Sequence, residues 1–192
     1  MNIEHLTRRE CLVTTGATAA FPDLIKSALS HRSLQALADH EFTHITYQCG
    51  QSLEVFKQWK PKITYDLVLN AFDFNHKGLI EEMEKCKAKE GVSRTGLVIC
   101  HAGAGTVLEV LRNGIPMVII PNDSLMENHQ MELADELDRQ GYATKSMVRN
   151  LHSAIRKACT KETRIWNGQN ASLAPIINEV VCCEEDTKVH QN

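Results

Sequence analysis

The chain has 192 residues, of which 43% are hydrophobic and 23% charged, and its formal net charge at pH 7 is −3. These proportions are typical of a folded globular protein with a sizeable core. The small negative charge gives no electrostatic basis for binding nucleic acid or an anionic membrane surface, and the aromatic content of 5% argues against a surface that stacks on bases.

The cysteines and the apolar runs indicate the compartment. Seven cysteines at irregular spacing favour free thiols in a reducing environment over a disulfide framework or a zinc site. The sequence shows neither the N-terminal apolar segment of a signal peptide nor an apolar run of the ~20 residues that a membrane span needs. We therefore expect a cytosolic protein.

Strand and helix patterns alternate along the chain. Runs of apolar and β-branched residues predict strands over 10–15, 42–49, 63–72, 97–100, 117–120 and 142–144. Apolar residues at helical spacing predict helices over 23–39, 53–59, 78–89, 106–113, 128–139 and 148–159. This alternation predicts an α/β fold with a mainly parallel, doubly wound, Rossmann-like sheet, in one domain over 1–160.

A tail over 161–192 follows that domain and contains a further helical pattern. Its apolar residues recur at the spacing of one helix face: Leu173, Ile176, Ile177, Val180 and Val181. We expect this stripe either to pack back on the sheet of its own chain or to contact a partner. The last residues, 184–192, are polar and are expected to fray.

The most informative segment is His-Ala-Gly-Ala-Gly-Thr, from His101 to Thr106, between a predicted strand and a predicted helix. Glycines such as Gly103 and Gly105 let the backbone approach a ligand closely, and a helix N-terminus offers unpaired N–H groups and partial positive charge. The expected ligand is a phosphate or diphosphate, most often part of a nucleotide. The spacing matches neither the dinucleotide-binding fingerprint nor a P-loop.

Two more polar segments follow predicted strands. Thr14, Thr15, Gly16 and Thr18 follow the first strand, and Asn128, His129 and Gln130 follow the strand over 117–120. The carboxyl ends of parallel strands lie at one edge of a sheet, where ligands of such folds bind. We therefore expect the three segments to form one site.

Three blocks of residues resemble a known family. They are 13–18 with 21–25, 101–106 with Glu109, and 121–122 with 125–130 and 132–134, and the likeness extends from about residue 11 to residue 145. Together they resemble the carboxyl-terminal, nucleotide-sugar-binding half of GT-B glycosyltransferases. Within that group they resemble the catalytic subunit of the two-part N-acetylglucosaminyltransferase that adds the second sugar to the dolichol-diphosphate oligosaccharide precursor.

The resemblance implies an activity and partners. The donor would be UDP-N-acetylglucosamine, and the acceptor dolichyl-diphosphate-N-acetylglucosamine, joined through its 4-hydroxyl in a β-1,4 link with inversion. No metal and no other cofactor are implied, because helix N-termini and backbone amides stabilise the leaving UDP. A membrane-anchored, acceptor-binding subunit is implied as partner, which would recruit the chain to the cytosolic face of the endoplasmic reticulum. The alternative is a non-catalytic module that binds nucleotide sugars or acts as a scaffold.

Two of the candidate positions have a structural interpretation beside the functional one. The loop at Gly16, with the hydroxyls of Thr14, Thr15 and Thr18, is expected to hold diphosphate or else to be an ordinary strand-to-helix turn. His101 is expected to contact the phosphate or sugar of the donor, or else to be a neutral structural histidine. It is also the one candidate for the general base, which otherwise stays unassigned because it lies on the acceptor half of two-domain relatives.

The remaining candidates lie at helix starts. Glu109 suits the ribose hydroxyls, since a carboxylate only accepts hydrogen bonds, but Thr106-Val107-Leu108-Glu109 also fits a capping box. Asn128, His129 and Gln130 suit the hydroxyl and N-acetyl groups of a sugar, or else form a solvated first turn. The segment 124–127 also resembles a capping box, which favours a structural role for Glu127. Cys100 is expected to be a buried, inert thiol.

Overall fold

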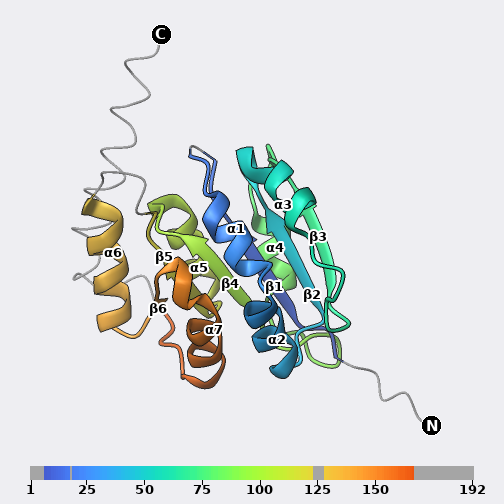
Figure 1. Ribbon diagram of the computed structural model, residues 1–192. Helices are drawn as coiled ribbons and strands as arrows, with labels where there is room; N and C mark the ends of the chain where they lie inside the picture. The colour runs from blue at the N-terminus through green and yellow to red at the C-terminus, as the bar shows by residue number, and fades with distance from the viewer. Residues whose placement is uncertain (1–6, 18, 123–127, 167–192) are drawn as a thin grey trace.

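The computed structural model describes residues 7–17, 19–122 and 128–166. They form a six-stranded sheet in which each neighbouring pair of strands is parallel, in the order β3-β2-β1-β4-β5-β6 (Figure 1). The strands are β1 (Glu10–Thr14), β2 (His44–Gln48), β3 (Val68–Phe72), β4 (Leu97–His101), β5 (Met117–Ile120) and β6 (Thr144–Lys145). The predicted α/β fold with a parallel, Rossmann-like sheet is confirmed.

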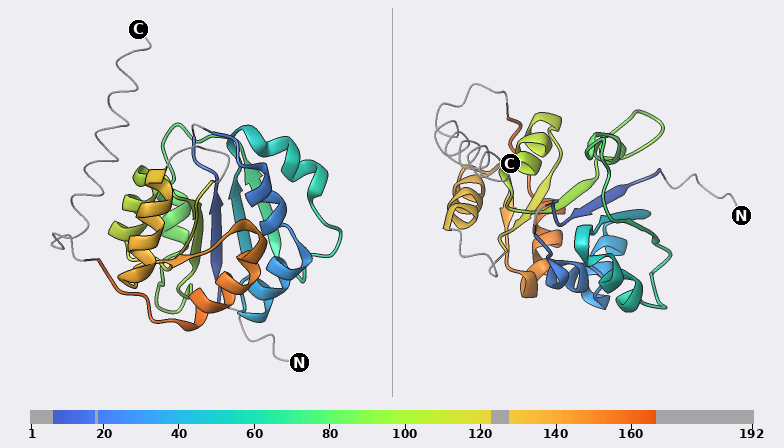
Figure 2. Two further views of the ribbon diagram at one scale, coloured as in Figure 1. Left: turned by 60° about the vertical axis from the view of Figure 1, so that its left-hand side comes forward. Right: turned by 90° about the horizontal axis from the view of Figure 1, so that it is seen from above.

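Helices cover both faces of the sheet, so the domain has three layers (Figure 2). One layer contains α1 (Pro22–Ala28), α2 (His31–Asp39), α3 (Leu53–Trp59) and α7 (Leu151–Thr160). The other contains α4 (Ile80–Lys85), α5 (Ala104–Asn113) and α6 (Asn128–Arg139). Short 3-10 turns precede α3, at Gly50–Ser52, and α7, at Val148–Asn150.

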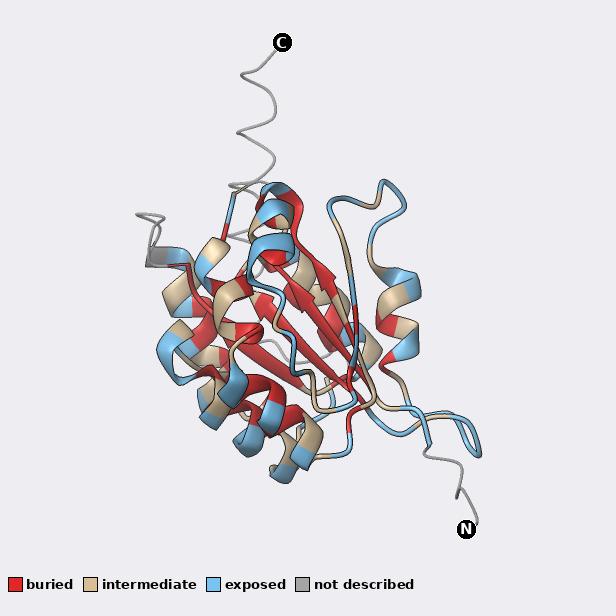
Figure 3. Cartoon of the chain, turned by 45° about the vertical axis from the view of Figure 1, so that its right-hand side comes forward, coloured by how far each residue is buried: buried red, intermediate tan, exposed pale blue. Residues whose placement is uncertain are grey.

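The core consists of two apolar clusters, one on each face of the sheet. In β1, for example, Val13 packs into one cluster and Leu12 into the other. Figure 3 shows the buried residues concentrated in the central strands and on the inward faces of the helices. Burial on both faces explains why these strands are continuously apolar instead of alternating.

Several predicted elements differ from the structure in extent: the helix predicted over 78–89, for example, is only Ile80–Lys85, and two larger differences have clear local causes. The strand predicted over 63–72 begins only at Val68, because Tyr65 and Asp66 have φ angles of 55° and 64°, a turn conformation that strands do not adopt. The helix predicted over 23–39 is two helices, α1 and α2. Ser30 separates them with an extended backbone, and its hydroxyl accepts a hydrogen bond from the N–H of Ser33, so it caps the second helix.

The strand order determines where a ligand can bind. The chain builds β1, β2 and β3 outward to one edge and then returns to β4, which lies beside β1 on the other side. The connections therefore diverge between β1 and β4, and such a switch point leaves a crevice at the carboxyl ends of the two strands.

Among the described helices, none has the length and apolar character needed to cross a membrane.

Candidate functional site

The loops that follow β1, β4 and β5 meet at the carboxyl edge of the sheet. The ring of His101, at the end of β4, lies against Gly16 in the loop after β1. Asn122, after β5, donates from Nδ2 to the Ala20 carbonyl oxygen (3.4 Å), and its N–H donates to Oε1 of Gln130 on α6 (3.2 Å). The structure thus brings the three predicted segments together at one place.

The His101 ring accounts for two of the glycines. A Cβ atom built on Gly16 or on Gly103 would lie less than 3.0 Å from ring atoms of His101. Gly16 also has a φ of +78°, which disfavours any other residue. Gly103 has an ordinary φ of −77°, so only the proximity of the ring explains the glycine there. Both loops are therefore packed around one imidazole.

His101 is held in its neutral form. Burial lowers the pKa of His101 to about 4. The nearby main chain of Thr14 raises this pKa, but its effect is smaller than that of burial. Nδ1 is buried and has no hydrogen-bond partner in the described part of the chain. Because a buried nitrogen without a partner is costly, such an atom beside an open loop suggests a ligand or water contact.

The hydroxyls of Thr14 and Thr15 are used inside the protein. Both residues are buried; Thr14 Oγ1 donates to Oε1 of Gln48 (2.6 Å), and Thr15 Oγ1 donates to the Gln48 carbonyl oxygen (3.4 Å). The N–H of Gly16 donates to Thr14 Oγ1 (3.2 Å). The two hydroxyls are therefore engaged within the protein, where they hold the loop. Thr18 lies outside the described residues.

Gln48 lies beside the candidate site, and the sequence analysis did not single it out. It ends β2 and is 4% exposed, and its amide reaches the loops after β1 and β3. A signal was present in the sequence, because a polar residue followed by Cys49-Gly50 at the end of an apolar strand is the same pattern that identified the other segments.

The first turn of α5 is open. The helix begins at Ala104, two residues earlier than predicted. Its N-cap residue is Gly103, so no side chain forms a capping hydrogen bond with the first turn. Its first main-chain bond runs from the N–H of Val107 to the Gly103 carbonyl oxygen (3.0 Å). The N–H groups over 104–106 have no acceptor among the described residues, and nothing lies within 4 Å of a Cβ built on Gly105. Such a turn can bind an anion.

The capping-box interpretation of Glu109 is wrong. Thr106 lies inside α5 instead of capping it, so Glu109 cannot close the helix start. The half-buried Glu109 carboxylate has no hydrogen bond or ion pair with any described residue; only its main-chain oxygen is used, accepting from Nδ2 of Asn113 (2.7 Å). Glu109 therefore retains its full capacity to accept hydrogen bonds from a ligand.

The third segment is only partly described. α6 begins at Asn128, where only the main chain is described; His129 is exposed, and Gln130 is half-buried and tied to Asn122. Residues 123–127, including the possible capping box that ends at Glu127, lie outside the described residues.

Other reactive groups in the described chain do not form a second centre. Burial raises the pKa of the Cys100 thiol to about 12, so it stays protonated and inert. The five described cysteines form no disulfide. No group of three or more histidine, cysteine or carboxylate side chains within the described ranges is placed to hold a metal ion.

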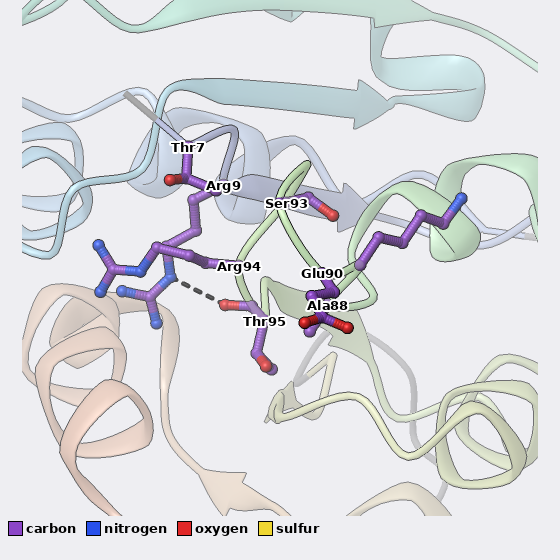
Figure 4. Close-up of a pocket in the computed structure, with 9 residues that line it drawn as sticks. Thr7, Arg9, Ala88, Glu90, Ser93, Arg94 and Thr95 are labelled. Carbon is purple, nitrogen blue, oxygen red and sulfur yellow. Dashed lines mark hydrogen bonds between the residues drawn. The ribbon is translucent and has the colours of Figure 1, made fainter. Parts of the chain in front are cut away.

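A basic pocket of about 510 Å³ lies at the opposite edge, where the strands begin (Figure 4). Its arginines already have partners. Arg9 Nε donates to the Thr95 carbonyl oxygen (2.9 Å), the Arg9 guanidinium lies 4.4 Å from the centre of the Phe42 ring, and Arg94 pairs with Glu41 (2.6 Å). Both arginine side chains are thus already engaged by the protein, so the carboxyl edge is the better candidate for a ligand site.

Comparison with known proteins identifies the family of this chain. The model of the glycosyltransferase family 28 C-terminal domain matches residues 10–180. The human UDP-N-acetylglucosamine transferase subunit ALG13 is 33% identical over 133 residues, or 69% of this chain, which spans only 11% of that relative's length. The ALG13 subunit of Cryptococcus neoformans var. neoformans (strain JEC21) is 32% identical over 181 residues, covering 85% of this chain and 88% of the relative.

A solved structure shares the fold over most of its length. The NMR solution structure of ALG13 superposes with a TM-score of 0.67 at 25% sequence identity, covering 90% of this chain and 96% of the other. The matched residues of the family model include all six strands and the three loops at the carboxyl edge. The chain therefore belongs to the glycosyltransferase family 28 C-terminal domain family, as a member of its ALG13 branch.

Proposed function

We propose that the chain binds UDP-N-acetylglucosamine at the carboxyl edge of its sheet and supplies the N-acetylglucosamine for a transfer reaction. The observation that carries the proposal is the meeting of three loops around His101, beside the open first turn of α5. The family, and the name carried by its relatives, support this donor.

Each part of the donor has a matching group at this edge. The N–H groups over 104–106 bind the diphosphate, and the open space beside Gly105 lets the phosphates come close. The free carboxylate of Glu109 accepts hydrogen bonds from the ribose hydroxyls. Asn128, His129 and Gln130, at the start of α6, lie where the sugar and its N-acetyl group are placed.

The acceptor in this proposal is dolichyl-diphosphate-N-acetylglucosamine. Its 4-hydroxyl attacks the anomeric carbon on the face opposite UDP, the bond from that carbon to the UDP oxygen breaks, and a β-1,4 link forms with inversion. The first turn of α5 stabilises the charge that develops on the departing diphosphate, which needs no metal.

The proton of the attacking hydroxyl passes to a base outside the described residues. A general base works best with a pKa near the operating pH, and the pKa of His101, about 4, is too low. We assign the base to a membrane-anchored, acceptor-binding subunit. That subunit also brings the chain to the cytosolic face of the endoplasmic reticulum membrane, where the lipid acceptor lies.

The test combines binding and turnover. We expect calorimetric titration of the full chain to detect UDP-N-acetylglucosamine, and we expect sugar transfer to a short-chain dolichyl-type diphosphate acceptor when the chain is reconstituted with its membrane partner. Binding without transfer by the reconstituted pair would instead favour a non-catalytic nucleotide-sugar module. The absence of binding, alone and with the partner, would contradict both interpretations.

A further inference from the structure

One amide side chain connects the ends of three neighbouring strands. Gln48, at the end of β2, accepts a hydrogen bond from Oγ1 of Thr14 at its Oε1 (2.6 Å). Its Nε2 donates to the carbonyl oxygen of Gly16 after β1 (3.1 Å) and to that of Asp73 after β3 (2.9 Å). Both amide hydrogens are thus used, and the buried side chain is fully engaged.

These bonds fix the position of Gly16 from two directions. The Gly16 carbonyl oxygen is held by Gln48, and its N–H is held by Thr14, whose hydroxyl is itself bonded to Gln48. On the outer side, a Cβ built on Gly50 would lie 3.2 Å from the same Gly16 oxygen. Little space is therefore available for the loop to move toward β3.

The other side of Gly16 is the His101 ring. Since the loop is pressed against that ring, its position determines how the ring is covered and how the loop lies relative to α5. A loop that moved by an ångström would uncover His101 and change the distance between the first and second segments of the site. The bonds of Gln48 therefore act on the site through Gly16.

We propose that Gln48 is a positioning residue of the donor site, which holds the loop after β1 in the geometry that binds the diphosphate. This inference rests on the proposed function for the identity of the ligand, but the placement of Gly16 against His101 can be tested without any ligand. Gln48 itself does not touch the donor.

Gln48→Met is the informative variant, because methionine has a similar length and no amide. We expect the dissociation constant for UDP, measured by calorimetry on the full chain, to rise about tenfold, as when one or two hydrogen bonds are lost. Thr14→Val is a milder variant that breaks the same connection at its other end. We expect it to weaken UDP binding in the same direction, which keeps the test valid if Gln48→Met fails to fold.

A control separates positioning from stability. Leu69→Ala removes a buried side chain of β3 that is not a partner in the hydrogen bonds of Gln48 or Gly16, so it should lower the melting temperature and leave UDP affinity unchanged. A Gln48→Met chain with a lowered melting temperature and UDP affinity within twofold of the unaltered chain would show that Gln48 is merely structural, and would overturn the inference.

The second readout is the titration of His101 by NMR, with no ligand present. Among the described residues, burial and the Thr14 main chain shift the pKa of this ring and no charged side chain does, which simplifies the measurement. We expect Gln48→Met to raise the pKa of His101 by at least one unit as the ring is uncovered, and Leu69→Ala to leave it unchanged. If the unaltered chain does not bind UDP, the proposed function fails. If the pKa of His101 is the same in Gln48→Met as in the unaltered chain, the positioning role is overturned separately.

Discussion

His101 is the residue around which the site is built, and its chemistry follows from its packing. Two glycines and a buried strand end remove the ring from water, so the neutral form is favoured and the pKa falls to about 4. A histidine that stays neutral at physiological pH can donate or accept a single hydrogen bond without adding charge. This property suits a contact with a donor sugar better than proton abstraction.

The low pKa of His101 predicts a loss of stability in mild acid. The unfolded chain binds a proton near pH 6.5 and the folded chain only near pH 4, so stability is full above pH 6.5 and falls as the pH drops between these values. We expect a loss of about 2 kcal/mol in the free energy of unfolding between pH 7 and pH 5. Urea denaturation at the two pH values measures it.

The variant His101→Asn serves as the reference for that measurement. It retains a polar group but no titrating ring, while the shift at His40, whose pKa burial also lowers, is present in both proteins. The difference between the two pH profiles therefore isolates His101. Parallel profiles would mean that the ring is protonated in the folded state with little penalty.

Glu109 is the other residue whose role can be tested in isolation. Its carboxylate has no partner in the described structure, so removing it costs the fold little. Glu109→Ala should weaken UDP-N-acetylglucosamine binding roughly 10- to 100-fold, as expected when hydrogen bonds to a charged acceptor are lost, with an unchanged melting temperature. Calorimetry gives the affinity.

Glu81→Ala provides a matched control for the charge. Glu81 lies exposed in the first turn of α4, and no described residue pairs with it. It should leave donor affinity unchanged. The assignment of Glu109 to the ribose would be abandoned if Glu109→Ala and Glu109→Gln bound donor as well as Glu81→Ala does and the reconstituted complex kept full activity.

At the scale of the element, the start of α5 has two glycines with opposite requirements, Gly103 at the N-cap and Gly105 in the first turn. Gly103 needs to be glycine because of the His101 ring, whereas a Cβ on Gly105 meets nothing within 4 Å. Alanine is a better helix former than glycine, so Gly105→Ala should preserve or raise stability, by up to about 1 kcal/mol. The same methyl group occupies the space proposed for the diphosphate, so donor binding should weaken at least tenfold. Thermal unfolding and calorimetry on the same sample measure the two effects.

Gly103→Ala is the contrasting variant. Its Cβ would lie against the imidazole, so it should lose stability as well as donor affinity. If Gly105→Ala bound donor normally, the open first turn of α5 would not be where the phosphates lie.

The elements themselves were largely predictable, and the exceptions have local causes. Alternating apolar strands and amphipathic helices identified the α/β fold because each pattern extends over many residues. The sequence analysis missed the break between α1 and α2 at Ser30, because the helical pattern of apolar residues continues on both sides of it. The break depends on a single residue, Ser30, whose hydroxyl caps α2. The false strand residues at Tyr65 and Asp66 have strand-like neighbours but left-handed backbones, which no periodicity reveals.

The candidate site was predictable where polar residues come soon after a strand in the sequence. His101, Gly16 and Gln130 were singled out in this way, and the structure brings their loops together, while their roles toward a ligand stay predictions. Gln48 shows the same pattern, a polar residue at a strand end just before a glycine, but its hydrogen-bond partners lie 25 to 34 residues away, and only the fold reveals them. The internal use of the Thr14 and Thr15 hydroxyls was hidden for the same reason, since it requires knowing which strand lies next to β1.

At the scale of the whole molecule, the last described residues, up to Trp166, pack back against the domain. Arg164 donates its N–H to the Gly141 carbonyl oxygen (3.1 Å), its guanidinium lies 5.2 Å from the centre of the Tyr142 ring, and Trp166 packs against the apolar cluster beside α6. The described members of both core clusters lie at or before Trp166. The apolar stripe between Leu173 and Val181 lies outside the described residues.

This division predicts the effect of removing the tail. If the stripe contacts a partner, a chain that ends at Ala171 should keep its melting temperature within a few degrees and its affinity for UDP-N-acetylglucosamine, because the described members of the core lie before that residue. It should no longer fractionate with membranes that contain the acceptor-binding subunit, since the stripe is then a partner surface. Membrane flotation of full-length and shortened chains, with the domain variant Glu81→Ala as a folded control, measures the association. A large fall in melting temperature would show instead that the stripe packs on the sheet of its own chain. If the shortened chain has the melting temperature and the membrane association of the full-length chain, the stripe is buried neither on the sheet nor against a partner.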